Sequence, residues 1–222
     1  MTTTLSIAQG TRNAGILLLS LLCVCCICAD SPDPIAYAND FHAVPVGKPP
    51  EDLMILNGSF TVAEFDGAKC LELAADPLDG DGLLFGPAGL VTSRVSARVW
   101  AEASGRRFPE FGIGSNDAGG FKLIVVPSQG TIELRRGDEP KASAPFSWKS
   151  AAWTRLRLHV SKSPDGSFQI QGKAWLDGTA EPKDWLIHMT EPAEPPAGRA
   201  SIWGMPYSEK PIRFGELGIA PK

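Results

Sequence analysis

The sequence predicts an all-β protein built as a two-sheet antiparallel sandwich with little helix. Three observations support this fold class. Most of the chain consists of short apolar segments bounded by Gly, Pro, Asp or Asn. Two of these segments alternate strictly between apolar and polar residues, and no window of a dozen residues carries the i, i+3, i+4, i+7 apolar stripe of a helix.

The expected strands follow one another from residue 59 to residue 219. Their predicted bounds are 59–65, 69–74, 82–85, 92–103, 108–114, 121–126, 131–136, 142–146, 153–161, 167–176, 185–189, 199–203 and 212–219. Several of the intervening turns carry Gly after Asp or Asn, as in Asp66-Gly67 and Asp177-Gly178. Glycine supplies the positive φ that tight hairpin turns require, so these dipeptides support the strand bounds.

Alternation is clearest in two of the expected strands and assigns their two faces, because successive side chains of a strand point to opposite sides. The expected core positions are Val95, Ala97, Val99, Ala101, Leu156, Leu158 and Val160. The opposite faces carry Arg94, Ser96, Arg98, Trp100, Arg155, Arg157 and His159. Each of these two strands therefore has one buried face and one polar face.

The N-terminus reads as a signal peptide. An uncharged apolar run from Ile16 to Ala29 follows a polar stretch whose only charge is Arg12, and a polar Asp-Ser-Pro sequence comes directly after it. The run is shorter than the ~20 residues of a spanning helix. We therefore expect a signal peptide at 1–29, a linker at 30–38 and one domain at 39–222, with cleavage after Ala29 or, alternatively, after Ala38. Export to the periplasm or the extracellular space follows, with no integral membrane segment after cleavage.

Charge and cysteine content exclude several classes of protein. Without residues 1–29 the chain has 20 Lys and Arg against 25 Asp and Glu, a net charge of −5, which argues against a nucleic-acid partner. Four of the five cysteines lie in the apolar run, so only Cys70 remains in the domain and no disulfide framework or zinc cluster is expected. Cys70, within a short apolar strand, is expected to be a small buried hydrophobe.

The order of motifs resembles the concanavalin A-like lectin/glucanase superfamily in its laminin-G-like jelly-roll form. The matching pieces are Asn39-Asp40-Phe41, Gly58-Ser59-Phe60-Thr61-Val62, Trp153-Thr154-Arg155-Leu156-Arg157-Leu158, Gly172-Lys173-Ala174-Trp175 and Ile212-Arg213-Phe214-Gly215-Glu216-Leu217. The resemblance implies a jelly roll with one concave sheet and with the first and last strands adjacent in the same sheet. It also implies carbohydrate binding on the concave face or the loop rim, and distant similarity to bacterial 3-keto-disaccharide hydrolase-type domains.

The acidic residues do not form a recognisable catalytic pair. Retaining glycosidases of family 16 place their carboxylates on one strand as Glu-x-Asp-x-x-Glu, and the chain has no such run. A hydrolase acting on a modified disaccharide or glycan through loop acids such as Asp79, Asp81 and Glu110 stays open as an alternative. Calcium is conceivable at Asp79 with Asp81, or at Asp40 with Glu216, but Asp-Gly-Asp-Gly is more often a plain turn, so we expect no metal and no cofactor.

The polar strand faces supply the candidate ligand site. Sugar binding needs aromatic planes for stacking and polar groups for hydrogen bonds to hydroxyls. The candidate residues are Arg98, Trp100, Arg155, Arg157, His159, Lys173 and Trp175. We therefore predict an exported, non-catalytic carbohydrate-binding or structural module with a glycan or polysaccharide as partner. The alternatives are the hydrolase and a protein interaction domain of the cell envelope, and the oligomeric state is left open.

Overall fold

Two antiparallel sheets make up the described part of the chain. The computed structural model describes residues 1–2, 36–75 and 80–220, and the described residues from 36 onward belong to one compact unit. The expected signal peptide and most of the expected linker lie outside the described residues. Among the described residues there is no helix, and hence none that could cross a membrane.

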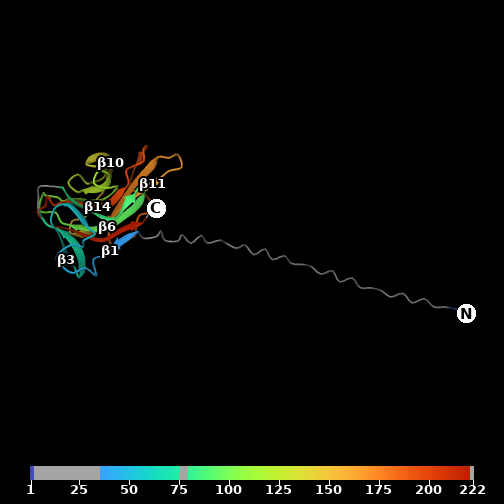
Figure 1. Cartoon of the computed structure of the whole chain (residues 1–222), viewed down its shortest axis with the longest axis horizontal. Helices are drawn as coiled ribbons and strands as arrows, with labels where there is room; N and C mark the ends of the chain where they lie inside the picture. The colour runs from blue at the N-terminus through green and yellow to red at the C-terminus, as the bar shows by residue number, and fades with distance from the viewer. Residues whose placement is uncertain (3–35, 76–79, 221–222) are drawn as a thin grey trace. The chain divides into compact units, whose positions relative to one another are not determined.

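The first sheet, called sheet A here, has eight strands. Its order is β13 (Ile187–Glu191), β12 (Phe168–Leu176), β11 (Ala152–Lys162), β6 (Ser93–Ala101), β15 (Ile212–Ala220), β4 (Ala68–Leu73) and β3 (Phe60–Phe65), with β1 (Tyr37–Asn39) pairing with the end of β15. The first and last strands are thus hydrogen-bonded neighbours (Figure 1), as the resemblance implied.

The second sheet, sheet B, has seven strands. Its order is β10 (Glu139–Pro145), β9 (Thr131–Arg136), β8 (Phe121–Val126), β7 (Glu110–Ser115), β14 (Gly198–Met205), β5 (Asp81–Leu90) and β2 (Met54–Asn57). Neighbours in both sheets are often far apart in sequence, because the chain crosses repeatedly between the layers. The predicted two-sheet antiparallel sandwich is confirmed.

The hydrophobic core lies between the sheets and is formed by the inward faces of most strands. Val95, Val99 and Leu158 from sheet A are fully buried, as are Phe111 and Leu123 from sheet B. All seven core positions expected from alternation are buried. Removing this apolar surface from water supplies most of the stabilising free energy. The opposite face of each sheet, which points away from the core, is called its outer face.

Two strands were not anticipated from the sequence. β1 has three residues at the junction of the expected linker and domain, and β2 has four exposed residues with no alternation, so neither carries the pattern that identifies a half-buried strand. Within 36–75, 80–220 the other strands match expected segments, with shifted ends. The largest shift is at the end of β5, which was expected at residue 85 and lies at Leu90. Trp185 was expected in a strand but precedes β13 and packs on His159.

Cys70 is a buried thiol, as expected. Its side chain lies in β4 with 1% of the residue exposed. Burial is the main reason that the pKa of Cys70 is raised to about 11. The thiol is therefore protonated at neutral pH and acts as packing rather than as a nucleophile.

Candidate functional site

The seven sequence-predicted residues all lie on the outer face of sheet A. β6 supplies Arg98 and Trp100, β11 supplies Arg155, Arg157 and His159, and β12 supplies Lys173 and Trp175. The register places Arg155 directly between Arg98 and Trp175, and Arg157 beside Lys173. Alternation in three neighbouring strands therefore brings the predicted set together on the face that points away from the core.

Charged groups of this face are already paired within the chain. Asp177, just after β12, accepts a hydrogen bond from Arg155 Nε at 2.5 Å and one from Arg98 Nη1 at 3.4 Å. Glu216 forms ion pairs with the same two arginines, at 2.9 Å and 3.3 Å. Burial alone would raise the pKa of Asp177, but the hydrogen bond and charge of Arg155 outweigh burial and lower it.

Glu216 reaches the arginines because β15 contains a bulge. The strand pairing shifts between Gly215 and Gly218, and Glu216 has a φ of 51°. Such a bulge inserts one extra residue and re-aims the side chains around it. The Gly-Glu-Leu-Gly run of the sequence is the only signal of this arrangement.

The connection from β12 to β13, residues 177–186, lies against this face and is called the covering segment. Its Glu181 pairs with Arg157 at 2.6 Å and with Lys173 at 2.7 Å, and Lys173 also donates to the Pro182 carbonyl at 2.7 Å. Its Trp185 stacks on His159 with ring centroids 5.7 Å apart. The groups expected to bind a glycan therefore have intramolecular partners, and their role in binding stays a prediction.

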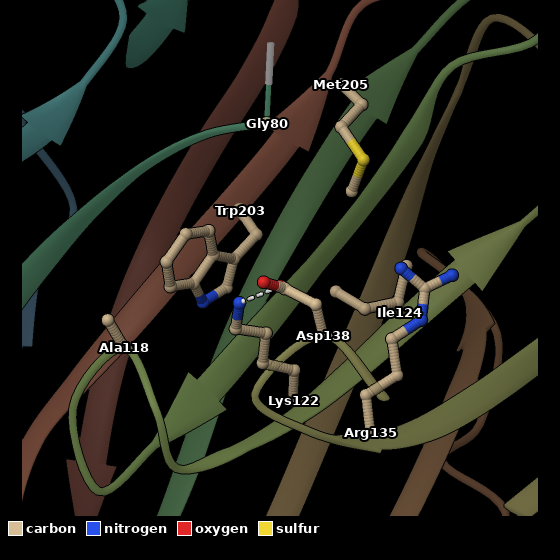
Figure 2. A pocket seen from close by; sticks show the side chains of 8 residues that line it. All are labelled: Gly80, Ala118, Lys122, Ile124, Arg135, Asp138, Trp203 and Met205. Carbon is tan, nitrogen blue, oxygen red and sulfur yellow. Dashed lines mark hydrogen bonds and ion pairs between the residues drawn. The ribbon is translucent and has the colours of Figure 1, made fainter. Parts of the chain in front are cut away.

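Sheet B presents a hollow on its outer face, with a volume of about 410 Å³. Figure 2 shows the residues that line it, which are Gly80, Ala118, Lys122, Ile124, Arg135, Asp138, Trp203 and Met205. They come mainly from the central strands β8, β9 and β14. None of them belongs to the sequence-predicted site.

Trp203 lies against glycine residues of the neighbouring strands. In the register it stands opposite Gly82 on β5 and Gly112 on β7. A Cβ at Gly82 would come within 2.6 Å of the indole, and one at Gly114 within 3.2 Å of its Nε1. The indole donates to Ser201 Oγ at 2.8 Å. Because these glycines have no side chains, the half-buried ring can lie close against the sheet. Figure 2 shows the ring face-on.

Lys122 places its ammonium group over this ring. Its Nζ lies 3.6 Å from the centroid of Trp203, which is cation–π geometry. The same nitrogen donates to Asp138 Oδ1 at 2.7 Å (Figure 2), and Asp138 reaches it from the turn between β9 and β10. This hydrogen bond is the main cause of the lowered pKa of Asp138. The aromatic plane, the cation and the carboxylate therefore meet in one place.

Arg135 lines another side of the hollow and forms ion pairs with two carboxylates. Its Nη2 lies 2.7 Å from Glu133 and 3.3 Å from Glu110. The three groups come from adjacent or nearby strands of sheet B and share its outer face. A guanidinium fork held between two carboxylates is a rigid, oriented set of hydrogen-bonding groups.

The acids considered for hydrolysis do not form a single site. Asp79 lies outside the described residues. Asp81 is 3% exposed and is paired in register with Gly204. A Cβ at Gly204 would point at core residues, so the side chain of Asp81, on the same face, points inward. Glu110 lies on the outer face with Arg135. Asp81 and Glu110 are therefore on opposite faces of sheet B.

The candidate calcium ligands have other partners where they are described. Asp40 accepts the backbone N–H of His42 at 3.0 Å, and Glu216 is held by the arginines of sheet A. Across residues 36–75 and 80–220 no three His, Cys, Asp or Glu side chains gather closely enough to hold a metal ion.

Sequence reasoning missed the hollow because its residues are scattered over three strands and the connections between strands, and follow no regular spacing. One signal was present. Glycine weakens a strand, so Gly112 and Gly114 two residues apart in one strand indicate a place where another group approaches the backbone closely. The group in question, Trp203, is about 90 residues away in sequence, and only strand order brings it there.

Comparison with known proteins establishes the fold. No family model matches the chain, and no curated protein matches it by sequence. Among solved structures, the carbohydrate-binding module CBM66 from Bacillus subtilis is 12% identical with a TM-score of 0.51, over 76% of this chain and 95% of that one. The Emp47p carbohydrate recognition domain is 11% identical with a TM-score of 0.55, over 84% and 95%.

An enzyme shares the same fold. The PL-14 alginate lyase from Aplysia kurodai is 10% identical with a TM-score of 0.55, over 85% of this chain and 100% of that one. At these identities the likeness concerns the fold alone. The chain has the concanavalin A-like jelly-roll fold, as the motif order predicted, and its function must be argued from its own side chains.

Proposed function

We propose that this protein binds carbohydrate in the hollow on the outer face of sheet B. The observation that carries the proposal is the indole of Trp203, which lies against Gly82 and Gly114 among oriented charged groups. A flat aromatic ring bordered by hydrogen-bonding side chains is what a sugar ring requires, since its C–H face stacks while its hydroxyls bond at the edges.

The fold neighbours support the same reading. Two of them are a carbohydrate-binding module and a carbohydrate recognition domain by name, so the scaffold is one that presents sugar sites. We further propose that the protein is exported, on the basis of the apolar run that ends at Ala29. An extracellular or periplasmic setting would give it access to polysaccharides.

The two faces can be tested against each other. Purified protein is screened on an array of neutral and acidic glycans, and Trp203→Ala is compared with Trp100→Ala, each checked for an intact thermal transition. We expect Trp203→Ala to lower affinity at least tenfold and Trp100→Ala to leave it within about twofold, given the stacking energy of an aromatic ring. The reverse pattern would move the site to sheet A.

Enzymatic activity is the second outcome to monitor, because the alginate lyase shares the fold. Each glycan that binds is incubated with the protein and examined for shortened products and for new double bonds. Turnover that Glu110→Gln abolishes would show that the protein is an enzyme rather than a binding module. Binding of a glycan without any product would support the proposal. Failure of every glycan to bind would refute it.

A further inference from the structure

The hollow contains a buried cation. Only 6% of the Lys122 side chain is exposed, and its ammonium group lies between the Trp203 ring and Asp138. Burying an ammonium group is costly unless an opposite charge accompanies it. The indole is uncharged, so a carboxylate must provide that charge.

The carboxylate that does so is almost entirely in water. The Asp138 side chain is 96% exposed, while it accepts the Lys122 hydrogen bond at 2.7 Å. Asp138 belongs to the turn that joins β9 to β10, next to Gly137 with a φ of 57°. The cation is thus fixed by packing, whereas its anion is attached through an exposed turn and can rotate into solvent when another anion takes its place on Lys122.

Other basic groups of the protein are held differently. Arg135, in the same hollow, contacts two carboxylates that both arise from strands. Lys173, which is equally buried on sheet A, is bound by both Glu181 and the Pro182 carbonyl. Among the described residues that line the hollow, Lys122 is therefore the base with a single, exposed acidic partner.

We propose that the hollow binds an acidic sugar, whose carboxylate takes the place of Asp138 on the Lys122 ammonium group. This inference rests on the proposed function and specifies its ligand as a uronic-acid-containing glycan. The sugar ring packs on the part of the indole that the Lys122 ammonium group leaves uncovered, and its hydroxyls reach Arg135 and Glu110. Asp138 acts as an internal competitor that keeps Lys122 neutralised when the hollow is empty.

The first test changes the competitor. Asp138→Asn keeps the shape of the side chain and removes its charge, so it is expected to tighten binding of uronate hexasaccharides several-fold. Glu139→Gln is the matched control, because it removes the same charge at the next residue, the first of β10, where Glu139 pairs with Lys141 at 2.8 Å instead of with Lys122. The probes are hexamers of mannuronate, guluronate and galacturonate, each with its carboxyl-reduced counterpart, and affinities are measured by calorimetry.

The second test changes the cation. Lys122→Met keeps an apolar stem of similar length and is expected to abolish the preference for uronates over their carboxyl-reduced counterparts. In the unaltered protein that preference should be tenfold or more and should fall as salt is added, because it depends on an ion pair. If Lys122→Met fails to fold, the Asp138→Asn and Glu139→Gln pair decides.

The outcomes separate this inference from the proposed function. Tighter uronate binding by Asp138→Asn but not by Glu139→Gln supports the inference. Equal effects of the two changes, or equal affinity for uronates and reduced glycans with Trp203 still required, would overturn the inference and leave carbohydrate binding intact. Failure of every glycan, neutral or acidic, to bind would refute both.

Discussion

The outer faces of the two sheets have similar chemistry but differ in the connections that cover them. Each combines tryptophan with arginine, lysine and carboxylates. On sheet A, the covering segment supplies Asp177 and Glu181 to arginines and a lysine, and its Trp185 stacks on the face. On sheet B, glycines replace bulky side chains around Trp203, and the connection at its edge is a short turn that contributes Asp138.

The difference shows that the connections, more than strand composition, decide which face can receive a ligand. A long connection that returns over its own sheet satisfies the polar groups beneath it and stabilises the fold. A tight turn, as at residues 137–138, leaves a hollow beside the polar groups of sheet B. We therefore expect changes on sheet A to affect mainly stability and changes on sheet B to affect mainly binding.

The largest effect on stability should come from Asp177→Asn. This change deprives Arg98 and Arg155 of a shared partner in a partly buried site, so it should cost about 2 kcal/mol of unfolding free energy at pH 7. Denaturant unfolding with calorimetric confirmation measures it. No loss of stability at pH 7 would contradict the view that the covering segment is a structural element.

The same carboxylate predicts a pH dependence. Because the folded-state pKa of Asp177 is lowered, its stabilisation is fully present above the unfolded-state pKa of about 3.9 and is lost as the pH falls through the lower folded-state pKa. The difference in unfolding free energy between wild type and Asp177→Asn should thus be constant from about pH 5 to pH 7 and should decrease below about pH 4. Unfolding free energies measured across this range test the sign.

A smaller stability effect, with a clear effect on binding, is expected for Gly82→Ala. The new Cβ would lie 2.6 Å from Trp203 Cε3, so the indole must tilt off the sheet. We expect a cost of about 1 kcal/mol and roughly a tenfold loss of glycan affinity. Gly119→Ala is the control, since its Cβ would meet no atom within 4 Å. Equal affinities of the two variants would show that the position of the ring is unimportant.

The smallest effect should come from Glu139→Gln at the rim of sheet B. Its ion pair with Lys141 is largely solvent-exposed, and such pairs contribute less than about 0.5 kcal/mol. Urea unfolding should therefore be nearly unchanged. A loss of unfolding free energy comparable to that of Asp177→Asn would mean that the surface ion pairs of both sheets stabilise the fold equally. The proposed difference between the two outer faces would then be wrong.

The sequence by itself determined the fold class and the faces of the long strands. Alternation in 94–101 and 153–160 depends only on the local geometry of a strand, so the buried set from Val95 to Val160 could be predicted without any knowledge of partners. The jelly-roll assignment followed because motif order persists along the chain. Strands without alternation, such as β2, carried no such signal.

Only the tertiary structure decided which polar groups are available. The sequence placed Arg98, Arg155 and Lys173 on one face, but it could not show that Asp177, Glu181 and Glu216 neutralise them. Nor could it show that Trp203 meets Gly82 and Lys122, because these contacts join residues of three strands that are not consecutive. Side-chain direction is a local property of a strand, whereas strand order and the course of a connection depend on the whole chain.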